Sequence, residues 1–232
     1  MRIGLFILTT ILLALSSTLH AQRFQGAVMG GMNIAQVDGD EVFGFKRVGG
    51  HFGLAAILPI NKWDITLETV FSQKGAREKP QYTYDKYVYD SASMSYDTLR
   101  YSGEYNLRLN YVEIPLMVHY TDRDWITAGA GFSYGRLVSL SEIEHSGNIP
   151  PYSDTVAFNK NDLNVLLDLQ VRVWRQLKFN VRYAYSVLPI RTRTYHDVLY
   201  QLKDPWDRKQ YNNLLTFRLV WVFNEQVPER RK

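Results

Sequence analysis

Residues 162–188 carry the most regular pattern of apolar and polar positions in the chain. Alternate positions over 163–173 are all apolar, and the positions between them are polar apart from Leu166. After a short break at 174–176, the alternation resumes over 177–187. Because successive side chains of a strand point to opposite faces, each half is predicted to be a strand with one apolar and one charged face. A tight turn between them makes a hairpin.

The length of these strands favours a membrane hairpin. An ordinary strand has about 5–6 residues, whereas a tilted strand needs about 9–11 residues to cross a bilayer. The apolar runs of this hairpin match the longer value. Weaker forms of the alternation predict six further strands, at residues 24–37, 46–60, 63–75, 105–120, 125–140 and 211–223.

The strand predicted at 105–120 changes phase along its length. Apolar residues occupy odd positions up to Tyr111 and even positions from Val112 onward. A slip of one residue reverses every face, so the pattern predicts a β-bulge near Tyr111 to Glu113. Pro115, which has no N–H to donate, fits beside such an irregularity.

The connections between the predicted strands alternate strictly between long and short. Tight turns are predicted around Asn61, Asp122 and Arg175, and the longer connections are 38–45, 76–104, 141–161 and 189–210. Consecutive antiparallel strands place alternate connections at opposite ends. Short turns at one end and long loops at the other are typical of outer-membrane barrels with an even number of strands.

One long connection, 76–104, is rich in tyrosine and is predicted to form a hairpin beyond the membrane. Aromatic side chains with a polar tip suit an exposed contact surface. The candidate partner surface consists of Tyr82, Tyr84, Tyr87 and Tyr89, together with Trp206 from the last loop.

Periodicity alone does not say whether the apolar face points outward. A soluble lipocalin-type barrel would bury it instead. The asymmetric loops favour lipid outside, as does a set of aromatics at the tight-turn end that would form a membrane-interface girdle. These girdle residues are Trp63, Tyr120, Trp125, Trp174 and Phe223.

The polar faces contain opposite charges that could pair inside the barrel. The candidate lumen ion network consists of Glu68, Glu113, Asp168, Arg172, Arg182 and Arg218. Glycines 129, 131 and 135 would leave room for arginines opposite. An eight-stranded barrel is just wide enough for its side chains to fill, so no open pore is expected. The predicted fold class is all-β, an eight-stranded antiparallel transmembrane up-and-down β-barrel with a filled polar lumen.

Residues 1–21 resemble a secretory signal, with a positive start and a short apolar run. Cleavage is expected between Ala21 and Gln22, leaving a barrel over 22–223 and a polar tail over 224–232. A membrane-anchor helix is the alternative, although the run is shorter than the roughly 20 apolar residues a spanning helix needs. The chain has no cysteine, so disulfides are excluded. A mean hydropathy of −0.25 argues against a helical membrane protein.

Composition and motifs exclude several other classes of function. The net charge of +4 is scattered along the chain, without the basic stripe of a nucleic-acid-binding protein. No metal-binding or cofactor motif is present, and no cofactor is expected. The histidines after the signal are His51, His119, His145 and His196. None has the spacing of a nucleophile and its base, although His145 and His196 lie in predicted loops, where an active site could form.

Several motifs resemble those of a known family. They are Gly31-Met32-Asn33, Phe71-Ser72-Gln73-Lys74-Gly75, Leu109 to Leu116, Arg182 to Ser186, and Pro189-Ile190-Arg191. Together they are similar to the PorT-like outer-membrane β-barrel family of the Bacteroidota. The resemblance implies a barrel in the cell outer membrane, surrounded by lipid, and carries over no catalytic motif. One member of that family is an accessory protein of type IX secretion and, in gliding relatives, of motility. The nine residues after Phe223 depart from the usual outer-membrane ending.

Four functions are therefore compared. The first is a non-enzymatic accessory barrel of type IX secretion, with other secretion components as partners. The second is a generic surface barrel with a stabilising or ligand-binding role. An outer-membrane enzyme acting on lipid and a porin are the remaining two, and the expected filled lumen argues against the porin.

Overall fold

The computed structural model describes residues 24–40, 42–79, 84–90, 95–101, 104–145, 157–195 and 206–225. Within these ranges, no helix is long and apolar enough to cross a membrane. The strands are β1 (Gln25–Asp38), β2 (Arg47–Ile60), β3 (Trp63–Glu78), β4 (Tyr84–Asp90), β5 (Ser95–Tyr101), β6 (Glu104–Asp122), β7 (Ile126–His145), β8 (Asn161–Trp174), β9 (Leu177–Ser186), β10 (Arg191–Tyr195) and β11 (Trp206–Val222).

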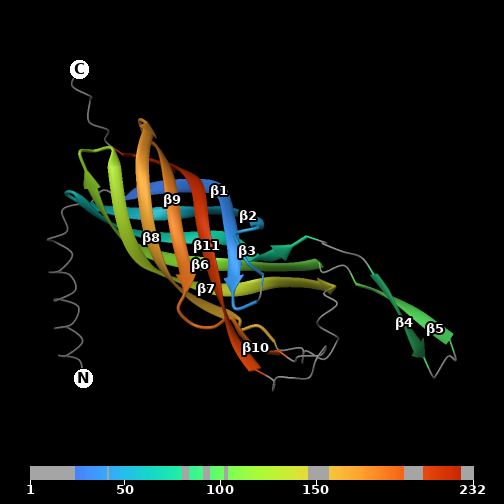
Figure 1. The fold of residues 1–232 in the computed structure, drawn as a ribbon. Helices are drawn as coiled ribbons and strands as arrows, with labels where there is room; N and C mark the ends of the chain where they lie inside the picture. The colour runs from blue at the N-terminus through green and yellow to red at the C-terminus, as the bar shows by residue number, and fades with distance from the viewer. Residues whose placement is uncertain are drawn as a thin grey trace, which may run out of the picture.

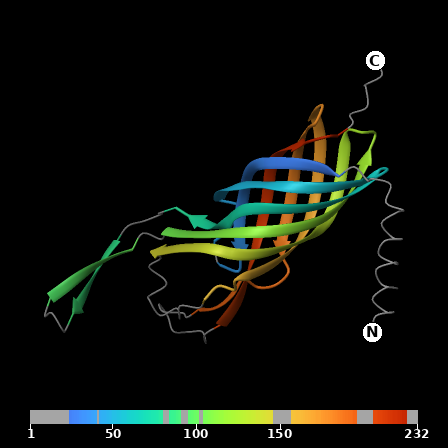
Figure 2. The same cartoon turned by 180° about the vertical axis from the view of Figure 1, so that it is seen from behind.

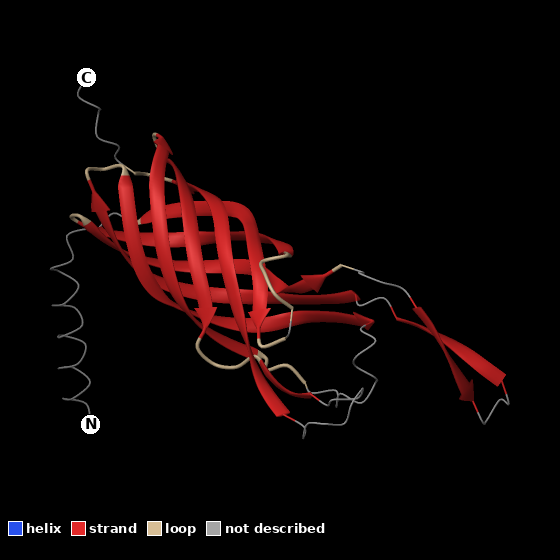
Figure 3. Cartoon of the chain, viewed as in Figure 1, coloured by secondary structure: helices blue, strands red, loops and turns tan. Residues whose placement is uncertain are grey.

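Eight of these strands form a closed antiparallel barrel, in the order β1-β2-β3-β6-β7-β8-β9-β11 (Figure 1). The last strand pairs with the first from Ala27↔Val222 to Asp38↔Tyr211, which closes the ring. Figure 3 shows the strands crossing the barrel at a tilt. Closure leaves no unpaired edge in the barrel wall, which a structure inside lipid requires. The predicted fold class is therefore confirmed.

The β8–β9 hairpin has the two faces that its sequence predicts. Asp168 lies opposite Arg182 and Leu167 lies opposite Tyr183 in the ladder. The two charged side chains are buried inside the barrel, whereas Leu167 is 54% exposed on its outer surface. Valine, isoleucine and aromatic side chains favour this pleated surface and, together with leucine, cover the outside of the barrel.

The three predicted tight turns all lie at one end of the barrel. Each contains a residue with positive φ, namely Asn61 (61°), Arg123 (48°) with Asp124 (60°), and Arg175 (40°). Such left-handed residues reverse the chain within a short hairpin loop, of two residues after β2 and after β8 and of three residues after β6. Three of the predicted girdle residues, Trp63, Trp125 and Trp174, are also at this end and are about half exposed.

The long connections lie at the opposite end and contain more strand than predicted. β3, β7 and β11 all extend past the predicted limits, and β10 pairs with the start of β11 inside the predicted loop 189–210. The prediction missed these extensions because they lie beyond the apolar band, where alternation is lost. β4 and β5 form the separate two-stranded hairpin predicted within 76–104. It projects away from the barrel in both views (Figures 1 and 2).

The phase change predicted in β6 is wrong. Leu107, Leu109 and Tyr111 are fully buried, so odd positions of β6 point inward along its whole length. A register shift does occur between Asn110 and Tyr111, but the extra residue is Val138 on β7. Apolar residues at the odd positions gave the wrong phase because they face inward in a region where the lumen itself is apolar.

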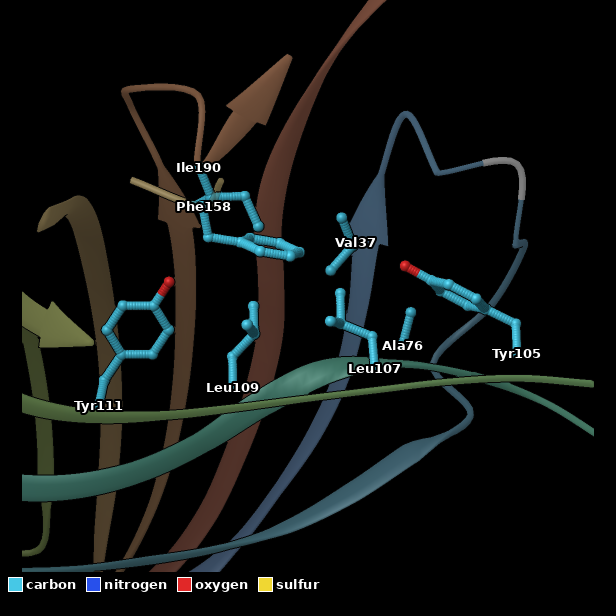
Figure 4. Packing of buried hydrophobic residues seen from close by; sticks show 8 residues of the cluster. All are labelled: Val37, Ala76, Tyr105, Leu107, Leu109, Tyr111, Phe158 and Ile190. Atoms are coloured by element: carbon cyan, nitrogen blue, oxygen red, sulfur yellow. The ribbon is translucent and has the colours of Figure 1, made fainter. Parts of the chain in front are cut away.

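An apolar plug fills the long-loop end of the barrel. Its members come from three strands and two loops: Val37, Ala76, Tyr105, Leu107, Leu109, Tyr111, Phe158 and Ile190 (Figure 4). Phe158 also lies beneath Arg191, with 4.0 Å from the guanidinium carbon to the ring centroid. The lumen is therefore filled at this end, as expected, but by apolar rather than polar side chains.

Candidate functional site in the barrel lumen

Four charged side chains meet in the middle of the lumen. Arg182 of β9 donates to both oxygens of Glu68 (2.8 and 2.9 Å) and to both oxygens of Asp168 (2.6 and 2.8 Å). Arg218 of β11 donates to both oxygens of Glu68 at 3.0 Å. All four residues are at most 5% exposed. Two acids and two arginines therefore form a neutral cluster that ties β3, β8, β9 and β11 together across the barrel.

Neutrality and complete hydrogen bonding make this burial of charge possible. An unpaired charge in a low-dielectric interior costs several kcal/mol, and excellent geometry is needed to offset that cost. The forked guanidinium matches a carboxylate with two parallel bonds, as seen for both arginines on Glu68. Arg218 also donates its Nε to Asn180 Oδ1 at 2.6 Å.

His119 extends the cluster toward the tight-turn end. Its Nδ1 lies 2.9 Å from Asp64 Oδ1, and its Nε2 lies 3.2 Å from Asp168 Oδ2. A Cβ on Gly129 would lie only 2.1 Å from the imidazole Cδ2. The three predicted glycines do make space in the lumen, but Gly129 makes it for His119, Gly131 for Met117 and Gly135 for Glu113, rather than for arginines.

A second charged cluster lies nearer the apolar plug. Lys74 Nζ is 2.5 Å from Glu113 Oε1 and 2.9 Å from Asp162 Oδ2. Asp162 also accepts from Ser186 Oγ (2.7 Å) and Asn212 Nδ2 (2.9 Å). This cluster joins β3, β6, β8, β9 and β11 below the plug.

Arg172 lies at the tight-turn end of the lumen, apart from both clusters. It forms a two-bonded pair with Glu225, at 2.9 and 2.7 Å. Lys178 approaches the same carboxylate at 3.0 Å. Glu225 follows β11 and belongs to the predicted polar tail.

A cavity of about 540 Å³ occupies this end of the barrel. One wall is polar and includes Asp64, His119, Arg172 and Lys178. Apolar residues of β1, β2 and β11 line the other side, namely Ala27, Met29, Ala55, Ile57, Val220 and Val222. Among the described residues, no group of acidic or histidine side chains is arranged to hold a metal ion.

The structure brings together four of the six residues of the predicted ion network: Glu68, Asp168, Arg182 and Arg218. Glu113 belongs to the Lys74 cluster and Arg172 to the Glu225 pair. Sequence reasoning missed Lys74, Asp162, Asp64 and His119 as network members. These four residues occupy inward-facing positions of the alternation, and this could have identified them. Alternation does not show, however, how far along the barrel axis each residue lies.

The candidate partner surface is divided in the structure. Tyr84, Tyr87 and Tyr89 belong to β4, whereas Trp206 begins β11 and pairs with Tyr195 of β10. The two extensions are separate in both views (Figures 1 and 2). Tyr82, His196 and the predicted cleavage residues Ala21 and Gln22 lie outside the described residues.

Comparison with protein families gives a match over residues 17–190 to the outer membrane protein β-barrel domain. The chain belongs to this family. It is therefore an outer-membrane protein, and the exposed apolar band described above is the surface in contact with lipid. A comparison with curated proteins gives no match.

Solved structures with a similar fold include outer-membrane proteins of several bacteria. Ail, the attachment invasion locus protein of Yersinia pestis, is 12% identical with a TM-score of 0.43, covering 86% of this chain and 98% of Ail. OprG from Pseudomonas aeruginosa is 11% identical with a TM-score of 0.41, covering 88% and 98%. A major outer membrane protein from Thermus thermophilus is 13% identical with a TM-score of 0.43, covering 88% and 100%.

Proposed function

We propose that this protein is a non-enzymatic accessory barrel of type IX secretion, which presents its outer β4–β5 hairpin to another secretion component. The projecting hairpin is the observation that carries the proposal (Figure 1). The motifs similar to the PorT-like family supply the link to this secretion system. Where gliding occurs, the same role would extend to motility.

The hairpin has features expected of a docking element. It is a sheet of two strands, seven residues each, and no third described strand pairs with it. An isolated two-stranded hairpin is only marginally stable in water. Its outer edges offer unpaired backbone groups to an extended segment of a partner, a common mode of recognition. The sequence of β4, with Tyr84, Tyr87 and Tyr89, supplies aromatic residues of the kind enriched at interfaces.

The lumen supports a scaffolding role rather than conduction. The apolar plug closes the long-loop end, and the two charged clusters fill the middle. These clusters span the barrel and would have to break for a solute to pass. The same packing gives a rigid base from which the hairpin projects.

Removing the hairpin tests the proposal. Residues 79–103 would be replaced by a short Gly-Ser linker between β3 and β6, which leaves every barrel strand in place. We expect the variant to reach the outer membrane at normal levels and to lose secretion of type IX cargo. Affinity purification of the full-length protein from solubilised outer membrane should recover a secretion component that the variant does not retain.

The second candidate function, a surface barrel without a secretion partner, makes the opposite prediction. Normal cargo secretion both in the hairpin variant and in a strain lacking the gene would contradict the secretion role. A control variant in which residues 146–156, the middle of the predicted loop 141–161, are replaced in the same way should leave secretion unchanged.

A further inference from the structure

Two cations lie side by side at the tight-turn mouth of the lumen. Arg172 and Lys178 are direct partners in the β8–β9 ladder. The guanidinium of Arg172 is held in place by the backbone carbonyls of Asp124 (2.8 Å) and Arg175 (2.6 Å). The two side chains are 15% and 13% exposed. Two largely desolvated like charges on neighbouring strands need an anion between them.

The chain itself supplies that anion. After β11, Asn224 adopts a left-handed conformation (φ 58°), and Glu225 follows with its carboxylate on both cations. Burial alone would raise the pKa of Glu225, but the hydrogen bond from Arg172 and the charge of Lys178 hold that pKa below its ordinary value. Glu225 is therefore a charged internal ligand on a preorganised carboxylate site.

An apolar surface begins directly beside this cation pair. Lys178 pairs with Val220 in the β9–β11 ladder, and Val220 pairs with Met29 in the β11–β1 ladder. Two residues nearer the mouth, on the same face of the sheet, Val222 lies opposite Ala27. Arg172, Lys178, Val220 and Met29 thus form one row across four neighbouring strands and line the same cavity. The row changes from charged to apolar within the span of a small molecule.

We propose that this cavity binds a small amphiphilic carboxylic acid that enters from the tight-turn end, which is the periplasmic end in outer-membrane barrels. Its carboxylate takes the place of Glu225 on Arg172 and Lys178, and its apolar part packs against Met29, Val220 and Val222. The Glu225 carboxylate therefore competes with the ligand for these two cations. This inference does not depend on the secretion role.

The geometry favours this ligand class over a compact inorganic anion. A volume of about 540 Å³ lies within the range of small-molecule sites, and the polar part of the lining adjoins the apolar residues Met29, Val220 and Val222. The planar fork of arginine matches a carboxylate through two parallel bonds. Arg218, deeper in the same cavity, is bonded to Glu68 of the barrel strand β3, whereas the mouth pair is bonded to Glu225, which follows the last strand. A ligand carboxylate can therefore replace Glu225 without breaking a contact between barrel strands.

Binding of hexanoate to the full-length protein in lipid nanodiscs, measured by calorimetry, tests the proposal. Glu225→Gln removes the competing charge and keeps the shape of the side chain. We expect this variant to bind hexanoate at least about tenfold more tightly than the wild type, a factor that corresponds to about 1.4 kcal/mol. Glu78→Gln is the matched control, because Glu78 pairs with Lys46 at the opposite end of the barrel. It should leave hexanoate binding at the wild-type value.

Further probes and variants separate the possible sources of binding. Hexanamide, which lacks the charge, and inorganic phosphate, which lacks the apolar part, should bind E225Q much more weakly than hexanoate does. Lys178→Gln in the E225Q background should abolish the gain, with circular dichroism confirming that the barrel is folded. Equal hexanoate affinity in wild type and E225Q would overturn the proposal. So would phosphate binding as tight as hexanoate, or a gain that persists without Lys178.

Discussion

Arg182 and Glu68 are 114 residues apart in the sequence and bind each other through two parallel hydrogen bonds across the lumen. They lie on β9 and β3, which are four steps apart in a ring of eight strands. This pair therefore joins opposite walls of the barrel. Because both groups are buried, this ion pair holds the two walls of the barrel together and blocks the middle of the lumen.

Neutralising Glu68 of this ion pair should lower the free energy of unfolding. Glu68→Gln leaves two buried arginines facing a neutral amide, and breaking a buried pair from one side costs about 3–5 kcal/mol. We expect a loss of that size in the free energy of unfolding, measured by urea titration in detergent micelles. Asp122→Asn is the control, because Asp122 and Arg123 form an exposed pair at 3.6 Å. Exposed pairs contribute less than about 1 kcal/mol. An equal loss in the free energy of unfolding for both variants would contradict a stabilising role of the Arg182–Glu68 pair.

Truncating the apolar plug should destabilise the long-loop end. Leu109 is fully buried, and Leu109→Ala should cost about 2–5 kcal/mol through lost packing and the cavity it leaves. Leu116, on the outer face of the same strand, is 53% exposed. Leu116→Ala should cost less, because lipid fills the space. If the order is reversed in parallel unfolding titrations, the inward assignment of Leu109 is wrong.

A charged residue on the lipid face should destabilise the folded barrel more strongly the deeper it lies in the bilayer. Leu167 lies in the middle of β8 and is 54% exposed, so Leu167→Arg should destabilise the folded barrel by about 2–4 kcal/mol. Leu140, near the long-loop end of β7, is 45% exposed. Leu140→Arg should cost only about 0–1 kcal/mol, because the interface is more polar. The free energies of unfolding of the two variants are compared in phospholipid vesicles. Equal losses of stability would count against a membrane location for the exposed apolar surface of the barrel.

Asp40, in the loop after β1, should make stability depend on pH. Burial raises the pKa of its carboxyl from 3.8 to about 7, and its Oδ2 has no hydrogen-bond partner among the described residues. The folded state therefore holds the proton more tightly than the unfolded chain. Its contribution to stability is fully present below pH 3.8 and is lost as the pH rises to about 7.

Asp40→Asn should remove this pH-dependent contribution while keeping an oxygen that can accept from Val42 N. Urea titrations at about pH 5 and about pH 8, on either side of the raised pKa, measure the difference. The wild type should lose more stability between the two values than the variant does. Matching losses in both proteins would show that Asp40 is already ionised in the folded state at the lower pH.

The barrel itself could be predicted because lipid outside and charge inside impose opposite demands on neighbouring residues. The clean alternation over 162–188 therefore gave the correct strands, faces and turn. The prediction of β6 was wrong where the lumen is apolar, since Leu107 and Leu109 resemble lipid-facing residues although they point inward. Local periodicity has no means of distinguishing an apolar plug from lipid.

The candidate site was less predictable because its contacts join distant parts of the chain. Alternation placed Glu68, Asp168, Arg182 and Arg218 on the inner face, and they do meet. It did not give their depth along the tilted strands, so Glu113 was grouped with them although it pairs with Lys74. The partner of Arg172 was missed because Glu225 lies in the tail, outside any periodic segment.

In a membrane barrel, the outer face of each strand touches acyl chains while the inner face lines a closed lumen. The chain has no cysteine, so Leu167→Cys and Gln170→Cys place single spin labels on opposite faces of β8. Electron paramagnetic resonance in lipid vesicles then compares access of oxygen, which dissolves in lipid, with access of a water-soluble nickel chelate. The label at 167 should be relaxed by oxygen and not by nickel, and the label at 170, which borders the turn-end cavity, should show the reverse. Nickel access at 167 with oxygen access at 170 would show that the apolar face does not contact lipid.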